Sequence, residues 1–177
     1  MKVLLFDLDG TLLRSDKTIS EKTYHAVMEA RKRGYYIGIS TSRSENNSLN
    51  FIEKISPEII ISSAGAMVSL KGKTIVLEEF TAKETEAIIA KGRELFGDLN
   101  ISVDTAGEKA EYYCNFDIPE TELAKSWGES IYTEFKDFRK PSLKICFEIT
   151  DPEKAELLHK ELPYCDMIHF TDRKSVV

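Results

Sequence analysis

The spacing of hydrophobic residues divides the first third of the chain into alternating strands and helices. Short apolar runs predict strands at residues 2–6, 35–40 and 58–62. Between them, residues 18–33 place apolar side chains at helical spacing, and the more polar residues 44–54 predict a weaker helix. This alternation is typical of a parallel sheet with right-handed crossovers. We expect the strand at 2–6 to be buried on both faces.

Residues that favour helix ends lie at the predicted boundaries. Thr18 and Glu21 fit a capping box at the start of the first helix, and Gly34 suits its C-terminal end. Two further capping pairs later in the chain are Thr81 with Glu84, followed by Gly97, and Thr150 with Glu153.

The pattern changes after the third strand. Residues 66–70 and 74–77 flank a Lys-Gly-Lys turn and predict a hairpin. Beyond it, the sequence predicts helices at 81–96, 119–127 and 151–161, and strands at 100–104, 111–116, 143–149 and 166–170. Hairpins interleaved with helices indicate a separate α+β lobe. The predicted fold class is therefore α/β, with a partial Rossmann-like parallel core in residues 1–80 and an α+β lobe in residues 81–170.

Two carboxylates end the first apolar run. Asp7 and Asp9 are two residues apart on a strand, so they project to the same side and can address one ligand. Gly10 allows a sharp turn after them, and the Thr11 hydroxyl can hold that turn. A hard cation such as Mg²⁺ would neutralise the two acids, and such a site suits phosphoryl transfer. The alternative is that both acids only form a turn.

Composition limits the classes of ligand that we expect the protein to bind and indicates its cellular compartment. The chain carries a net charge of −6, which gives no electrostatic footprint for nucleic acid or an anionic membrane. No apolar stretch approaches the roughly 20 residues that span a bilayer. Three widely spaced cysteines without a zinc-type spacing are expected to be reduced, which favours a soluble, cytoplasmic protein.

The sequence FDLDGTLL at residues 6–13 resembles the first motif of the haloacid dehalogenase-like (HAD) superfamily. The resemblance implies that Asp7 is the nucleophile and Asp9 the general acid/base. It also implies that the Asp7 side chain and the Asp9 backbone carbonyl hold Mg²⁺.

A second motif follows the second predicted strand. Thr41 in ISTSR matches the family's phosphate-binding hydroxyl, and Arg43 is an expected phosphate or substrate contact. Similar members commonly have glycine where this chain has Ser42, and Asn where it has Ala64. The residues assigned to substrate binding are Gly10, Thr11, Thr41, Ser42 and Arg43.

The lobe at residues 81–170 is similar to the cap inserted into the core of the Cof-type (type IIB cap) branch. The lysine and the acidic metal-binding segment that follow the cap in that branch have no match in this sequence. We therefore expect a C-terminally truncated member, in which residues 171–177 form a tail of non-native origin.

Two functions follow from this interpretation. The first is a Mg²⁺-dependent phosphatase of small phosphorylated metabolites such as sugar phosphates, impaired in this short form. The second is a non-catalytic binding or interaction protein that keeps half of the site. The sequence selects neither a substrate nor an oligomeric state.

Overall fold

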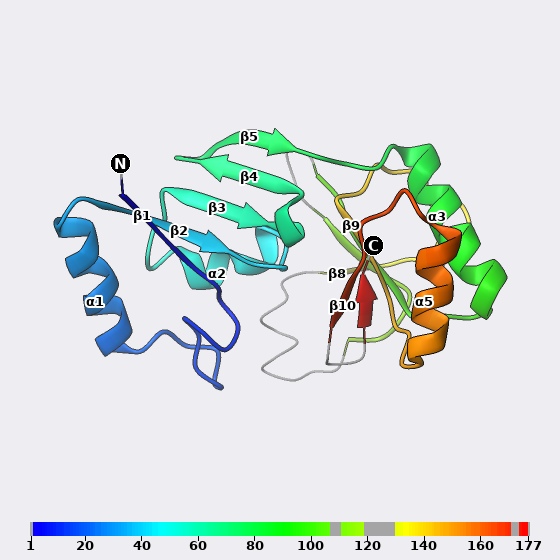
Figure 1. The fold of residues 1–177 in the computed structure, drawn as a ribbon, viewed down its shortest axis with the longest axis horizontal. Helices are drawn as coiled ribbons and strands as arrows, with labels where there is room; N and C mark the ends of the chain where they lie inside the picture. The colour runs from blue at the N-terminus through cyan, green and yellow to red at the C-terminus, as the bar shows by residue number, and fades with distance from the viewer. Residues whose placement is uncertain (1, 107–110, 119–129, 171–173, 177) are drawn as a thin grey trace. The chain divides into compact units, whose positions relative to one another are not determined.

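The computed structural model describes residues 2–106, 111–118, 130–170 and 174–176. Within them the chain forms two compact units, one built on residues 2–78 and the other on residues from 79 onward (Figure 1). Each unit has its own sheet and its own hydrophobic core. In the part of the chain described, no helix combines the length and apolarity that crossing a membrane requires. The helix predicted at 119–127 lies outside the described residues.

The first unit contains a five-stranded sheet. Its strands, in spatial and chain order, are β1 (Lys2–Phe6), β2 (Tyr35–Ser40), β3 (Ile59–Ser62), β4 (Met67–Leu70) and β5 (Lys73–Leu77). β1, β2 and β3 are parallel, and β3, β4 and β5 are antiparallel. The predicted parallel core and the predicted hairpin are both present.

Helix α1 (Glu21–Lys32) connects β1 to β2 and begins later than predicted. Its N-cap is Ser20, whose hydroxyl accepts a hydrogen bond from the Thr23 N–H at 3.0 Å. The predicted capping role of Thr18 is wrong, because its hydroxyl and N–H both donate to Asp16 Oδ1. Gly34, at φ +86°, follows the helix end as expected. The weak helix predicted at 44–54 is reduced to the short elements η1 (Asn46–Ser48) and α2 (Leu49–Ile52).

Strand β1 is not buried on both faces, so that prediction is wrong. Leu4 and Phe6 pack against the core of the first unit, whereas Val3 is 36% exposed and Leu5 is 51% exposed. The reason is the position of the strand. β1 lies at the edge of the sheet, and among the described strands it pairs only with β2.

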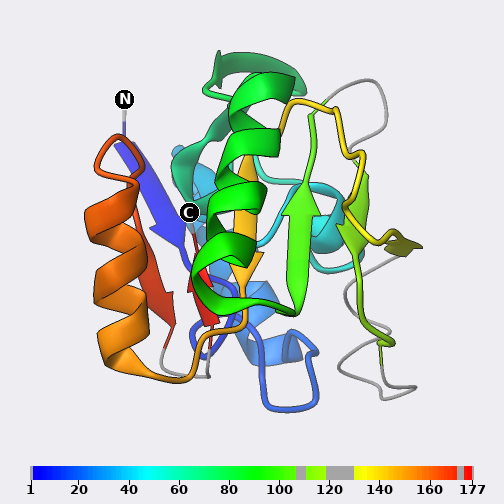
Figure 2. The same ribbon diagram turned by 90° about the vertical axis from the view of Figure 1, so that its right-hand side faces the viewer.

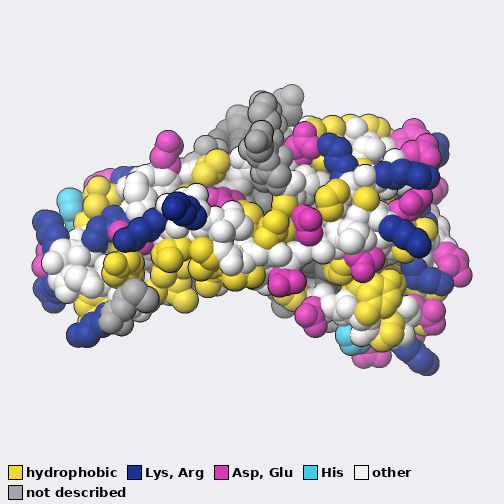
Figure 3. All heavy atoms as spheres, turned by 90° about the horizontal axis from the view of Figure 1, so that it is seen from above, with side chains coloured by type: hydrophobic (Ala, Val, Ile, Leu, Met, Phe, Trp, Pro, Cys, Tyr) yellow, Lys and Arg dark blue, Asp and Glu magenta, His cyan; other side chains and the backbone are white. Residues whose placement is uncertain are grey.

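The strand register places many apolar side chains on the same face as Val3 and Leu5. These are Ile59 and Ile61 of β3, Val68 and Leu70 of β4, and Val76 of β5. The opposite face holds the core residues Ile37 and Ile39. In the left half of Figure 3, hydrophobic side chains gather along this unit. A contiguous apolar face of this kind is typical of an interface.

The second unit contains a six-stranded sheet. Its strands in chain order are β6 (Ile101–Asp104), β7 (Tyr112–Cys114), β8 (Ser130–Tyr132), β9 (Lys144–Phe147), β10 (Ile168–Phe170) and β11 (Lys174–Val176). The spatial order is β10-β11-β9-β6-β7-β8, and only the β7–β8 pair is parallel. Strands β8 and β11 were not predicted.

Helices α3 (Ala82–Phe96) and α5 (Pro152–Glu161) cover one face of this sheet (Figure 2). The capping box of Thr81 and Glu84 is confirmed at the start of α3. The predicted Thr150 cap of α5 is wrong, because the Asp151 side chain accepts from the Glu153 N–H instead. Packing of α3 on β9 is close, since a Cβ added at Gly92 would lie 2.6 Å from the Phe147 ring.

The other face of this second sheet is polar. Alternation along β6 directs Ile101 and Val103 into the core, and Ser102 and Asp104 to the opposite side. Asp104 is 2% exposed, and its Oδ2 lies 2.7 Å from Nζ of Lys144 on the neighbouring strand β9. The second unit therefore contains a buried ion pair in register across two strands.

We predict that breaking this pair destabilises the protein more than losing an exposed one. Lys144→Met should lower the free energy of unfolding by about 3 kcal/mol, because it leaves the Asp104 carboxylate buried without its cation. The double variant Asp104→Asn/Lys144→Met should recover much of that loss. Lys136→Met, which removes an exposed ion pair, should cost under about 1 kcal/mol. Urea unfolding of the four proteins tests this, and equal losses for the two lysine variants would contradict it.

A second ion pair ties α1 to the start of β3. The Arg31 guanidinium donates to Glu58 and to the carbonyl oxygens of Ile55 and Ser56, and the Glu58 carboxylate also accepts from the Ile37 N–H. Burial alone would raise the pKa of Glu58, but the hydrogen bonds from Ile37 and Arg31 outweigh it and lower the pKa below 4.5.

This lowered pKa predicts an acid-dependent loss of stability. The ionised Glu58 stabilises the folded state above its unfolded pKa, and that contribution disappears as the pH falls through the lower folded pKa. Glu58→Gln should therefore be less stable than the wild type at pH 7. On acidification from pH 7 to a pH below the folded pKa of Glu58, the variant should lose less stability than the wild type loses. Thermal melts across that range test this. Parallel losses in the two proteins would contradict it.

Candidate functional site

The carboxyl ends of the three parallel strands meet at one edge of the first sheet. Residues 7–13 follow β1, residues 41–43 follow β2, and residues 63–65 follow β3. The Thr41 N–H donates to the Ile61 carbonyl at 2.9 Å, and the Ser63 N–H donates to the Arg43 carbonyl at 2.7 Å. These bonds fix the second and third loops to each other. Open α/β sheets bind ligands at this edge.

The loop after β1 is organised around Leu8. Leu8 is fully buried, and its carbonyl accepts hydrogen bonds from the N–H groups of Thr11, Leu12 and Leu13. The residues on either side, Asp7 and Asp9, are exposed. A buried leucine between two acids therefore directs both carboxylates to the surface at the strand end. Gly10 provides the turn at φ +76°.

The Asp9 carboxylate binds two cations. Nε of Arg43 lies 2.7 Å from Oδ2, and Nη2 of Arg43 lies 3.1 Å from Oδ1. Nζ of Lys17 lies 2.6 Å from Oδ1. The hydrogen bond from Arg43, against the opposing effect of burial and with the help of Lys17, holds the pKa of Asp9 at about 2. Asp9 is thus ionised at neutral pH in this arrangement, the state that can accept a proton.

Lys17 was not among the residues predicted for the site. It lies in a tight turn, where the Arg14 N–H donates to the Thr18 carbonyl and the Lys17 N–H donates to the Arg14 carbonyl. Asp16 accepts from Thr18 in the same turn. An Asp followed two residues later by Thr is a turn signal, but it does not indicate where the lysine between them points.

The Asp7 side chain differs from that of Asp9. Among the described residues it makes no hydrogen bond or ion pair, and its main-chain carbonyl accepts from the Leu12 N–H at 3.2 Å. The described residues bring together no group of three or more His, Cys, Asp or Glu side chains that could hold a metal. Mg²⁺ often takes only one or two protein carboxylates, with water and phosphate oxygens completing its shell. The exposed Asp7 carboxylate fits such a minimal site, in which the Asp9 backbone carbonyl would be the second protein ligand.

The loop after β2 holds the other predicted residues. Thr41 is 5% exposed, and its hydroxyl oxygen accepts from the Arg43 N–H at 3.2 Å. The Arg43 guanidinium lies 5.1 Å from the centre of the Phe51 ring, which supports its approach to Asp9. Ser42, between them, is half-buried. Of the predicted site residues, Asp9 and Arg43 are in direct contact. The roles of all the predicted site residues stay predictions, for Asp7, Asp9 and Arg43 as well as for Gly10, Thr11, Thr41 and Ser42.

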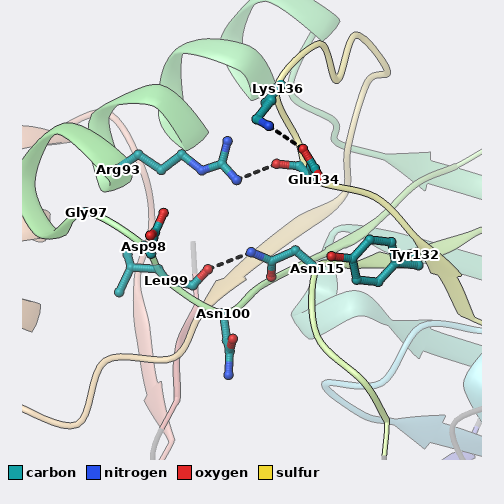
Figure 4. Close-up of a pocket in the computed structure, with 9 residues that line it drawn as sticks. All are labelled: Arg93, Gly97, Asp98, Leu99, Asn100, Asn115, Tyr132, Glu134 and Lys136. Carbon is teal, nitrogen blue, oxygen red and sulfur yellow. Dashed lines mark hydrogen bonds and ion pairs between the residues drawn. The ribbon is translucent and has the colours of Figure 1, made fainter.

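A separate cavity lies wholly within the second unit (Figure 4). Its volume is about 540 Å³, and it is lined by Arg93, Gly97, Asp98, Leu99, Asn100, Asn115, Tyr132, Glu134 and Lys136. Arg93 donates to the Glu134 carbonyl, and Asn115 donates to the Leu99 carbonyl at 2.7 Å. The Asn115 amide oxygen also accepts from the Ile101 N–H. These contacts connect the walls of the cavity. None of the predicted site residues lines it.

A model of the haloacid dehalogenase-like hydrolase family matches residues 4–173. The chain belongs to this family. The match includes both Asp7 and Asp9 and the Thr41–Arg43 loop, and it extends through most of the second unit.

Two known relatives of this HAD-like chain differ in how much of it they match. YitU of Bacillus subtilis, a 5-amino-6-(5-phospho-D-ribitylamino)uracil phosphatase, is 42% identical over 53 residues, which are 30% of this chain and 20% of YitU. A protein of Streptococcus pyogenes is 23% identical over 189 residues, which cover 100% of this chain and 66% of that protein. The chain therefore spans just under two thirds of the relative that it matches end to end.

Solved structures show the same fold. A HAD-like hydrolase from B. subtilis has a TM-score of 0.78 at 18% identity, covering 99% of this chain and 72% of the other. The subclass IIB sugar phosphatase BT4131 has a TM-score of 0.77 at 19% identity, covering 99% of this chain and 69% of the other. The predicted fold class and the resemblance to the HAD superfamily are both confirmed.

The loop after β3 carries unusual backbone geometry in this HAD-like chain. Ser63 and Ala64 have φ values of +50° and +59°, and Gly65 follows at +104°. The Ala64 N–H donates to the Thr41 carbonyl at 3.3 Å, so this turn holds the loop that carries Thr41 and Arg43. An alanine in the left-handed region is strained by about 1 kcal/mol, whereas Asn and Gly adopt that region readily.

We predict that Ala64→Gly raises the free energy of unfolding by about 0.5 kcal/mol, because relief of the strain exceeds the greater freedom of glycine in the unfolded chain. Ala66 is the matched control. It lies two residues further on at φ −64°, so Ala66→Gly should destabilise the protein. Chemical unfolding of the two variants measures the difference. Destabilisation by both to the same extent would contradict the strain argument.

Proposed function

We propose that this protein is a Mg²⁺-dependent phosphatase that acts through a phosphoaspartyl intermediate on small phosphorylated metabolites. The observation that carries the proposal is the placement of Asp7 and Asp9 on either side of buried Leu8 at the end of β1. Membership of the HAD-like hydrolase family supports it.

The first half of the reaction forms the covalent intermediate. An oxygen of the Asp7 carboxylate attacks phosphorus, and the bond from phosphorus to the ester oxygen of the substrate breaks. Asp9 in its protonated form gives its proton to that leaving oxygen. Contact with Arg43 and Lys17 opposes protonation of Asp9, so the proton-donating step requires the carboxyl group to move away from both cations.

The second half releases phosphate. Water attacks phosphorus, Asp9 accepts a proton from it, and the bond from phosphorus to the Asp7 oxygen breaks, which restores both carboxyl groups. Arg43, which contacts Asp9, and Thr41, whose hydroxyl accepts from the Arg43 N–H, are proposed to bind phosphoryl oxygens. Mg²⁺, held by the Asp7 carboxylate and the Asp9 backbone carbonyl, would offset negative charge on the phosphoryl group.

The second unit is proposed to act as the cap that selects the substrate. It has a core of its own and a sheet of its own, which includes β11 (Lys174–Val176) beyond the predicted limit at residue 170, as a lobe that opens and closes requires. YitU is named for a phosphorylated ribityl compound and BT4131 for sugar phosphates. Phosphate esters of polyhydroxylated carbon chains are therefore the proposed substrate class.

A non-catalytic binding protein was the alternative from the sequence. Neutralisation of Asp9 by two cations fits a binding site as well as an active site. Relatives named as phosphatases favour the enzyme.

We predict that Asp7→Asn abolishes phosphate release from sugar phosphates, because the amide cannot act as the nucleophile. Asp9→Asn should slow turnover of an alkyl phosphate by about 100-fold or more, the usual scale for loss of a general acid/base. Glu53→Gln, an exposed change in the same unit, is the control and should keep the wild-type rate. Phosphate release is measured with and without Mg²⁺. Activity that survives Asp7→Asn would exclude the proposed mechanism.

A further inference from the structure

Lys17 contacts the candidate site from a segment to which neither strand-end motif assigns a role. Its Nζ lies 2.6 Å from Asp9 Oδ1, and its side chain is only 26% exposed. Arg43 approaches the same carboxylate from a different loop, and its side chain is 11% exposed. Two half-buried or buried cations therefore converge on one carboxylate at the edge where parallel strands end.

The backbone at Lys17 is strained. Its φ is +60°, a value that lysine rarely adopts, and the turn from Arg14 to Thr18 holds it there. A strained residue that persists in a fold often marks a functional position. Here the strained backbone coincides with the contact between Lys17 and Asp9.

We propose that Lys17 and Arg43 form a phosphate-binding pair, and that the Asp9 carboxylate occupies this pair as an internal counter-ion until the phosphoryl group of the substrate replaces it. The inference rests on the proposed phosphatase function and adds Lys17 as a residue that binds the phosphoryl group. An ammonium and a guanidinium that satisfy one carboxylate can satisfy phosphoryl oxygens in the same way.

Exchange of this kind couples binding to catalysis. When phosphoryl oxygens take over Lys17 and Arg43, the Asp9 carboxylate loses both of its cations together. It is then free to turn toward the leaving oxygen of the substrate. A purely structural ion pair has no such exchange, because Asp9 and Lys17 would stay together when phosphate binds.

The test is a calorimetric titration, in which inorganic phosphate is added to the 177-residue protein in metal-free buffer. Lys17→Met should weaken phosphate binding by about fivefold, and Lys17→Arg should restore it. Lys54→Met is the matched control, because Lys54 is also a lysine paired with one carboxylate, Glu21, at 2.7 Å in the same unit. It should bind phosphate as the wild type does.

Asp9→Asn gives the sharper result. Removing the internal counter-ion frees both cations, so phosphate should bind more tightly than to the wild type, although turnover falls. The double variant Asp9→Asn/Lys17→Met should lose part of that gain. Thermal melts of each variant confirm that it is folded before the affinities are compared.

The outcomes separate the two proposals. If the wild type binds phosphate but Lys17→Met binds it equally well, or if Asp9→Asn does not bind more tightly, the role of Lys17 is wrong and the phosphatase proposal stands. If the wild type neither binds phosphate nor hydrolyses a sugar phosphate with Mg²⁺ present, both proposals are wrong.

Discussion

Burial of one side chain, Leu8, decides the geometry on which the candidate site depends. Its side chain is fully buried and its carbonyl accepts the hydrogen bonds that close the following turn, so the chain cannot rotate at this point. Neighbouring residues must then face outward, and both are acids. Placing two negative charges so close together costs free energy, and the two acids offset that cost in different ways. Asp9 is paired with Arg43 and Lys17, whereas Asp7 stays exposed to solvent.

Local patterns predicted the elements well, because the forces that set them act over a few residues. The alternation of strands and helices, the hairpin after β3 and the capping box of Thr81 with Glu84 are all present. Two helix caps were predicted at the wrong residue, because another residue close in the sequence can take the same role. Ser20 caps α1 in place of Thr18, and Asp151 caps α5 in place of Thr150, since either residue of each pair can accept the N–H.

Features that depend on distant partners could not be predicted. Exposure of Leu5 follows from the position of β1 at the sheet edge, which its own apolar sequence does not encode. Lys17 contacts Asp9 from a position with a left-handed backbone, a geometry that the surrounding sequence does not specify. For the site, the sequence predicted the acids and Arg43, whose motifs are local, but not the contact between Asp9 and Arg43 across 34 positions of sequence.

The position of β1 also bears on self-association of the chain. An apolar edge strand with unpaired backbone groups is a template for aggregation, and charged residues at its ends act as gatekeepers. Lys2 precedes the apolar stretch Val3–Phe6, and Asp7 and Asp9 follow it. The acids proposed for catalysis thus also disfavour pairing of the exposed edge strand with a strand of another chain. Selection for solubility and selection for activity would then act on the same two positions.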